Sequence, residues 1–324
     1  MVGSLLLLGP QRPSQNLSEA LGTVPGDGPV VLITAGWRHD EGEVESLQRV
    51  AGSSALHLPI YRWFDELMTS QPALANAWRL RQAKVLELKA LHRLRLLPAI
   101  DALRQMMDRV SAGSEIARPQ FQWSLDHLRE LDQQLLDHAA VISRQHPEVL
   151  RPWEHPAVAA IHQRVAEAFA GSRAILVAGG HVAVLRNRLE FFGLRPLLHQ
   201  AVARGTSVIA WSAGAMCLTD RIVLFYDDPP DGAGHPELLD RGFEMADSVV
   251  LLPHCRERLT LSDRRRVSLL ATRFAPDACL GLENGAWLVR NGDRWLNRGP
   301  PGSAVWLWPD GDVRPLARPL EGPA

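Results

Sequence analysis

The chain has 324 residues, and its 35 lysines and arginines nearly balance its 36 aspartates and glutamates. This length allows one large α/β domain or two smaller ones with a sizeable core. Because the formal net charge is only −1, the composition argues against nucleic acid and an anionic membrane as partners. The three cysteines, Cys217, Cys255 and Cys279, are odd in number and lack CxxC spacing, so we expect no disulfide framework, no zinc site and a reducing cytoplasm.

The first part of the chain has the pattern of a buried parallel sheet. Short apolar runs ended by glycine or proline predict strands at 4–8, 30–34 and 56–60, with a helix at 43–50. The second strand leads into the loop Ala35-Gly36-Trp37-Arg38, at the carboxyl end of a strand, where open α/β sheets bind ligands. No apolar stretch approaches the length of a membrane-spanning helix, and no basic region precedes the first strand, so we expect neither a membrane span nor a signal peptide.

From 63 to 145 the strand signal gives way to helical spacing. Apolar residues recur every three or four positions from 91 to 110 and from 121 to 142, on either side of a polar turn at 111–114. We predict an antiparallel helical hairpin whose first arm is kinked or divided by Pro98. The apolar stripes are interpreted as packing seams, against the α/β body or a second copy of the chain.

After residue 147 the α/β pattern resumes. Apolar runs predict strands at 174–178, 207–211, 248–252, 279–282, 286–290 and 304–308, and helical spacing predicts helices at 156–170, 189–202 and 262–271. The predicted fold class is therefore α/β, with a mainly parallel sheet and helices on both of its faces, interrupted by a long helical hairpin insertion. We expect residues 1–62 and 147–324 to form the α/β domain and residues 63–146 to form the insertion.

The run Ser207–Trp211 ends at Ser212, between small residues that include Ala213 and Gly214. A buried strand turning sharply into a helix at a serine is typical of a nucleophile elbow, although Ala210 stands where the usual pattern has glycine. The alternative is a plain βα turn with an incidental serine. An amidotransferase-like transferase is disfavoured, because that chemistry uses an elbow cysteine and Cys217 lies further along, inside the helix.

A serine needs a base to remove its proton, and that base is usually an oriented histidine. His254 directly follows the apolar strand 248–252, where active-site loops collect in such folds, although a loop histidine is the alternative. The histidines in or beside the helical pattern are most simply exposed helix residues: His57, His92, His127, His138 and His146. We expect no metal, because there is no HExxH and His181, His235 and His254 share no ligand-like spacing.

An acyl-transfer site also needs hydrogen-bond donors for the oxyanion and an acid to orient the histidine. The amide of Ala213 is one natural donor, and Gly179-Gly180 at a strand end could bring another amide close. Glu283 follows the strand 279–282 and is a candidate acid, with Asp227, Asp228 and Asp247 as rivals. The cluster Arg256, Arg258, Arg264, Arg265 and Arg266 is interpreted as a solvated face from which one arginine could meet a substrate carboxylate.

In this order, the motifs resemble the serine hydrolase family of cyanophycinase and dipeptidase E (peptidase E-like), which has a class I glutamine amidotransferase-like fold. Four segments carry the resemblance: Val177–Gly180, the SAGA turn at Trp211–Ala215, the stretch from Arg241 through His254 to Leu259, and Gly281–Ala286. The resemblance implies a serine-type peptidase without a cofactor, in which Ser212 is the nucleophile and His254 the base. It further implies Gly180 and Ala213 as oxyanion donors, with Gly179 beside them, and Glu283 as the acid.

Four departures separate the chain from that pattern, and one of them is the helical insertion between Arg62 and Gln145, which has no counterpart in it. His181 replaces the polar residue after Gly-Gly, Cys255 replaces phenylalanine after the histidine, and Asn284 stands where a second acid is common. We therefore expect a small peptide or amide substrate, without carrying over the family's cyanophycin or Asp-X preference. A homodimer is a possible assembly. The alternative function is an inactive peptidase E-like protein that binds a ligand or another protein through the helical hairpin.

Overall fold

The computed structural model describes residues 3–12, 15–225, 235–291 and 294–317. Its largest sheet contains β1 (Leu5–Leu8), β2 (Val30–Ile33), β3 (Leu56–Leu58), β4 (Ala174–Val177), β5 (Ser207–Trp211), β10 (Trp287–Asn291) and β11 (Arg294–Asn297). The strand order is β11-β10-β1-β5-β4-β2-β3, and every pair from β1 to β3 is parallel, while β10 and β11 add antiparallel strands at one edge. Strand β5 is buried throughout, which matches its unbroken apolar sequence.

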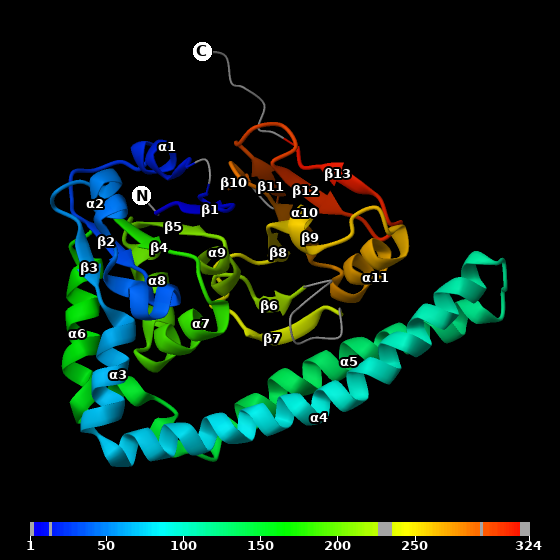
Figure 1. Cartoon of the computed structure of the whole chain (residues 1–324), viewed down its shortest axis with the longest axis horizontal. Helices are drawn as coiled ribbons and strands as arrows, with labels where there is room; N and C mark the ends of the chain where they lie inside the picture. Colours follow the sequence, from blue (N-terminus) through cyan, green and yellow to red (C-terminus); the bar gives the residue numbers. More distant parts are fainter. Residues whose placement is uncertain (1–2, 13–14, 226–234, 292–293, 318–324) are drawn as a thin grey trace.

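Helices cover both faces of this sheet (Figure 1). Helices α1 (Leu17–Gly22) and α2 (Glu45–Ala51) pack on one face, through buried leucines and alanines. The other face is covered by α3 (Ile60–Ser70), α6 (Pro156–Ala170), α7 (Val182–Phe191) and α8 (Leu194–Ala203). The longer helix α11 (Arg264–Phe274) lies in the C-terminal part of the chain. The remaining helices are short: α9 (Ala213–Cys217), α10 (Cys255–Arg258), and the 3-10 helices η1 (Ala35–Gly42), η2 (Pro147–Val149) and η3 (Pro152–Glu154).

A second sheet contains three of the later strands that the sequence predicts, those at 248–252, 279–282 and 304–308, whereas the strand predicted at 286–290 is β10 of the first sheet. It contains β8 (Val249–Pro253), β9 (Ala278–Leu282), β12 (Ala304–Leu307) and β13 (Val313–Pro315), in the order β13-β12-β9-β8. Strands β8 and β9 are parallel and in register from end to end, so their carboxyl ends lie side by side. A separate two-stranded ribbon, β6 (Arg221–Leu224) and β7 (Glu237–Arg241), has no counterpart in the sequence prediction.

The insertion is an antiparallel helical hairpin of α4 (Pro72–Ser111) and α5 (Ala117–Arg144), which runs along the body and projects beyond α11 (Figure 1). The predicted fold class, a mainly parallel α/β sheet interrupted by a hairpin, is confirmed. Pro98 lies inside α4 without dividing it. The boundary at residue 63 stays a prediction, although Trp63 and Phe64 of α3 are buried in the core of the body.

The predicted helix over 189–202 is instead two helices, because the chain turns at Gly193. Gly193 has φ +68°, and a Cβ there would lie 2.5 Å from the Trp153 ring. Only glycine meets both conditions without strain. The helix predicted at 262–271 is α11, which begins at Arg264, because Asp263 caps it and accepts hydrogen bonds from the amides of Arg265 and Arg266.

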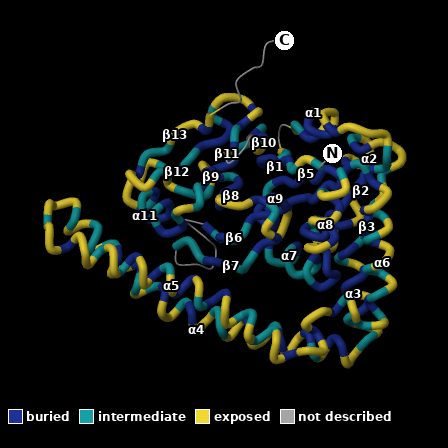
Figure 2. The backbone as a smooth tube through the Cα atoms, turned by 180° about the vertical axis from the view of Figure 1, so that it is seen from behind, coloured by how far each residue is buried: buried dark blue, intermediate teal, exposed yellow. Residues whose placement is uncertain are grey.

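The hairpin contacts the body through its apolar seam and through a buried ion pair. Leucines and an isoleucine of α4 and α5 form a small core with Leu269 of α11, so the seam packs partly against the body (Figure 2 shows the alternation of buried and exposed residues). Next to this core the Arg273 guanidinium makes a bidentate pair with the Asp132 carboxylate, at 2.6 and 2.7 Å. His92 lies beside this pair. Both His92 and His146 are buried, so the expectation that they are exposed helix residues is wrong. His57 lies in strand β3 and not in a helix.

Candidate active site

Ser212 occupies a strained turn between β5 and α9. Its backbone has φ +49° and ψ −121°, a region that residues with a side chain rarely adopt. The amide of Ser212 donates to the Leu8 carbonyl at 3.1 Å, and the Ser212 carbonyl accepts from the Met216 amide at 3.1 Å, so both sides of the turn are fixed. Ser212 is partly exposed although its neighbours are buried. This is the strand–turn–helix geometry that a nucleophile elbow requires.

Two glycines allow the end of β4 to approach this turn closely. A Cβ on Gly179 would lie 3.0 Å from Ser212 Cβ, so Gly179 is in direct contact with the serine. A Cβ on Gly214 would lie 2.3 Å from the Val177 carbonyl oxygen. Larger residues at either position would push the elbow away from the end of β4.

The loop after β2 packs tightly against Gly179 and Gly180. Gly180 has φ +115°, and a Cβ on it would lie 2.4 Å from the Gly36 oxygen. The Gly36 carbonyl also accepts a hydrogen bond from the His181 amide at 2.8 Å. Within the described residues, the amides of Gly180 and Ala213 have no hydrogen-bond partner, so both remain available as donors.

Replacing Gly36 with alanine tests this packing. A Cβ on Gly36 would lie 2.5 Å from the Gly179 carbonyl oxygen, so the backbones must separate. We expect a loss of about 1–3 kcal/mol in the free energy of unfolding, measured by urea denaturation. Gly42→Ala in the same loop is the matched control, because a Cβ there would meet nothing within 4 Å. Equal stability of the two variants would contradict the tight packing.

His254 and Glu283 come together at the carboxyl ends of β8 and β9. Pro253 and Leu282 are paired in register, and the His254 amide donates to the Leu282 carbonyl at 2.9 Å. His254 itself has φ +57° and ψ +39°, the left-handed conformation, at the turn into α10. The parallel pairing therefore places the residues after both strands next to each other.

The His254 ring contacts a different carboxylate from the one expected. Its Nδ1 lies 3.2 Å from Oε2 of Glu257, three residues further along, whereas Glu283 accepts a hydrogen bond from the Arg256 amide at 2.8 Å. No hydrogen bond joins the His254 ring to Glu283 or to Ser212 Oγ in the part of the chain that the structure describes. The sequence reasoning missed Glu257, whose only signal is its i+3 spacing from His254 on a single helical turn.

Charges around His254 set its protonation. Burial lowers the pKa of His254 from its ordinary value, the neighbouring Arg258 lowers it further, and Glu257 and Glu283 act in the opposite direction. The net effect favours the neutral ring, which is the form that can accept a proton.

The rival residues occupy other environments. Asp247 pairs with Arg290, and Asp227 and Asp228 lie outside the described residues. Cys217 is buried within α9, and burial raises the pKa of its thiol to about 12, which argues against a cysteine nucleophile.

The described ranges contain no group of three or more His, Cys, Asp or Glu side chains that could hold a metal ion. They also contain no helix both long and apolar enough to cross a membrane.

A polar cavity of about 960 Å³ opens at the same carboxyl edge, beyond β2 and β3. Arg38, which lines it, has φ +61° and ψ −119°, nearly the same strained conformation as Ser212. The Glu41 carboxylate accepts hydrogen bonds from the first amides of α3, those of Tyr61 at 2.7 Å and Arg62 at 3.0 Å. Burial raises the pKa of Glu41 to about 7, against the lowering effect of these hydrogen bonds. Nothing in the sequence pattern had singled out Glu41.

Comparison with known proteins gives one family match. The family model of peptidase family S51 matches residues 154–297. No curated protein matches the chain. A peptidase from an acI-B1 actinobacterium is 15% identical over 98% of this chain and 95% of that one, with a TM-score of 0.49. A peptidase E candidate from Listeria monocytogenes EGD-e is 12% identical over 93% of this chain and 100% of that one, with a TM-score of 0.44.

The matched region contains the elbow, the Gly-Gly strand end and the paired ends of β8 and β9. The family match, which includes Ser212, His254 and Glu283, supports a peptidase-type hydrolase. Residues 154–297 are therefore similar to peptidase family S51.

Proposed function

We propose that the chain is a serine-type peptidase that cleaves small peptides or amides through an acyl-enzyme on Ser212. The observation that carries this proposal is the strained backbone of Ser212, held in contact with Gly179 at the carboxyl edge of the sheet. Strain of this kind costs about 1–3 kcal/mol and persists where the surrounding structure imposes it, most often at functional sites. A plain βα turn would not require it.

In the proposed reaction, neutral His254 accepts the proton of Ser212 Oγ as the oxygen attacks the substrate carbonyl. The amides of Gly180 and Ala213 donate to the developing oxyanion, and both are free of other hydrogen bonds within the described residues. His254 then gives its proton to the leaving amine, and water hydrolyses the acyl-enzyme by the same steps. The ring must turn toward Ser212 for this, away from its contact with the exposed Glu257.

Two carboxylates compete for the role of orienting acid. Glu283 follows β9 beside His254 and is largely buried, whereas Glu257 contacts the ring but is 76% exposed. We favour Glu283, because a carboxylate shielded from water can hold the ring in one orientation while Ser212 reacts. Glu283→Gln keeps an acceptor for the Arg256 amide and removes only the charge, so it isolates this role.

The pH profile tests the base. Because the pKa of His254 is lowered, we expect kcat/KM to stay high at neutral pH and to fall only as the pH drops through a midpoint below 6.5. Glu257 raises this pKa, so Glu257→Gln should move the acidic midpoint to lower pH. Glu148→Gln, an exposed acid on η2, is the control and should leave the midpoint unchanged. A midpoint that moves up in Glu257→Gln would contradict the assignment.

The activity itself is tested on a panel of unmodified dipeptides, tripeptides and amino-acid amides, with released amino groups as the readout. We expect cleavage of at least one class by the parent chain and cleavage about 10⁴-fold slower by His254→Gln. A chain that is folded by circular dichroism and cleaves nothing would support a second candidate, a ligand-binding protein without catalysis. That candidate is favoured by one observation, the missing hydrogen bond between His254 and Ser212 within the described residues.

A further inference from the structure

A cavity of about 510 Å³ lies between the hairpin and the body, away from the proposed active site. Helices α4 and α5 line one side, and α7, α8, η3 and β7 line the other. Ser212, His254 and Glu283 are not among its lining residues. A volume of this size is within the range of small-molecule binding sites.

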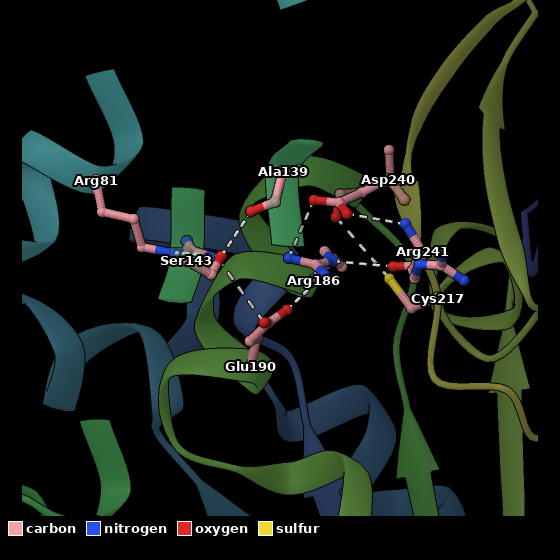
Figure 3. A network of polar contacts seen from close by, with 9 residues as sticks. Arg81, Ala139, Ser143, Arg186, Glu190, Cys217, Asp240 and Arg241 are labelled. Carbon is pink, nitrogen blue, oxygen red and sulfur yellow. Dashed lines mark hydrogen bonds and ion pairs between the residues drawn. The ribbon is translucent and has the colours of Figure 1, made fainter. Parts of the chain in front are cut away.

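Cationic side chains dominate the charge of this cavity. Two carboxylates line it, Glu190 and Asp240, against six cations: Arg81, Lys89, Arg144, Arg186, Arg195 and Arg241. Both carboxylates are already engaged by Arg186, whose Nη2 lies 2.5 Å from Glu190 and whose Nη1 lies 3.1 Å from Asp240 (Figure 3). Arg195 and Arg241 pair with acids outside the lining, Glu244 and Asp137. Of the six cations, Arg81, Lys89 and Arg144 are therefore the ones that nearby carboxylates neutralise least.

The environment of Arg81 illustrates this. Its guanidinium is nearly buried, and its two hydrogen bonds, from Nε at 3.1 Å and Nη2 at 2.8 Å, go to the neutral Ser143 hydroxyl (Figure 3). The nearest carboxylate, Glu190, is 4.0 Å away and is shared with Arg186. Burying a cation against a neutral partner is unfavourable unless an anion is bound nearby.

Lys89 is the cation with most capacity for a ligand. It is half-buried in the cavity and, within the described residues, has no hydrogen-bond or ion-pair partner. Burial lowers the pKa of its ammonium, Arg186 and Arg81 lower it further, and Asp240 acts in the opposite direction. An anion beside Lys89 would relieve both the burial cost and the repulsion from these arginines.

Apart from a few uncharged polar side chains, the rest of the lining is apolar. Leucines of both hairpin helices, together with Trp153, Pro196 and Phe243 of the body, complete the wall. Such a surface holds the hydrocarbon part of a ligand, while the cations fix its charged end.

We propose that this cavity binds an amphipathic organic anion, a carboxylate or phosphate attached to an apolar group, with the anionic end at Lys89 and Arg81. The hairpin then has a defined role, since it supplies these two cations and closes a site that the body alone lacks. This inference does not depend on the proposed peptidase activity.

The chain offers a direct probe, because Lys84 and Lys89 are its only lysines and both lie on α4. Reductive methylation with ¹³C-formaldehyde gives each lysine a methyl signal that is followed by NMR while phenyl phosphate or phenylacetate is added. We expect a saturable shift of the Lys89 signal and none of the signal from exposed Lys84. Inorganic phosphate and acetate, the bare anions, should bind about tenfold more weakly or less, because they lack the apolar contacts.

Variants give the controls. Lys89→Met should weaken binding of phenyl phosphate in calorimetry about tenfold or more, and Lys84→Met should leave it unchanged. Ala140→Trp, which fills the cavity from α5, should abolish binding while leaving both lysines in place. Absence of a saturable Lys89 shift at millimolar probe, equal binding by Lys89→Met, or equal affinity for the bare anions would overturn the proposal.

Discussion

Ser212→Ala is expected to lower kcat/KM for any substrate of the chain by about 10⁴-fold or more, without loss of folding. Alanine keeps the Cβ that contacts Gly179 and removes only the hydroxyl that the proposed acyl-enzyme requires. The oxyanion donors and the substrate contacts remain, so a small residual rate over water is expected. The measurement is a progress curve on the best substrate of the panel, with thermal unfolding as the check on folding.

His254→Gln provides the comparison for this result. Because the nucleophile and the base act as one unit, removing either should cost about the same, and removing both should cost little more. Ser207→Ala, at the buried start of β5, is the control for loss of a serine hydroxyl on the strand that leads to Ser212. A Ser212→Ala variant that retains a tenth or more of the parent rate would exclude Ser212 as the nucleophile.

Asp132→Ala should lower the free energy of unfolding by about 3–5 kcal/mol, the second large effect. The exposed fractions of Arg273 and Asp132 are only 2% and 6%, so the variant leaves a guanidinium buried without its carboxylate. Within the described residues, the hydrogen-bond acceptor that remains for its guanidinium is the Pro236 carbonyl, which is neutral. Urea denaturation measures the change.

Asp137→Ala is the matched control on the same helix. Asp137 also pairs with an arginine of the body, Arg241, but the two side chains are 58% and 41% exposed. Exposed pairs contribute about 0–1 kcal/mol, so this variant should be nearly as stable as the parent. Replacing Asp132 and Arg273 together with leucine and methionine should recover most of the lost stability, since no charge is then left buried. Equal losses in Asp132→Ala and Asp137→Ala would contradict the role of the buried pair.

The sequence predicts the parts of the site that depend on local pattern. An unbroken apolar run ending at Ser212 is sufficient to predict a buried strand and a turn, and the structure has both. His254 and Glu283 each follow an apolar run, so their places after β8 and β9 also follow from the sequence. These features are local, because the pattern of apolar residues in a strand and the position where the strand ends depend on a few adjacent residues.

What the sequence does not predict depends on contacts between distant segments. That β8 and β9 form a separate sheet follows from the pairing of β9 with β8 on one side and β12 on the other, and periodicity does not reveal pairing partners. The burial of His92 depends on Asp132 and Arg273, which lie on other helices. The orientation of the His254 ring toward Glu257 is a side-chain preference within one turn, and strand pattern carries no information about it.

The continuity of helix α4 is another feature that depends on contacts between distant segments. Pro98 predicts a kink or a division of the first arm, since proline removes a hydrogen bond and clashes with the preceding turn. The long helix α4 nevertheless continues through it, and on both sides of Pro98 its buried residues Leu96, Ile100 and Leu103 pack into the seam. Packing against the partner helix outweighs the unfavourable effect of one proline, and the sequence of α4 alone does not reveal this packing.

The most direct test of the proposed mechanism is covalent labelling with an alkyl fluorophosphonate, followed by mass mapping of the modified peptide. The account predicts one label on Ser212, formed rapidly by the parent chain and lost in both Ser212→Ala and His254→Gln. A folded parent chain that takes no label at Ser212, or a His254→Gln variant that labels at the parent rate, would contradict it.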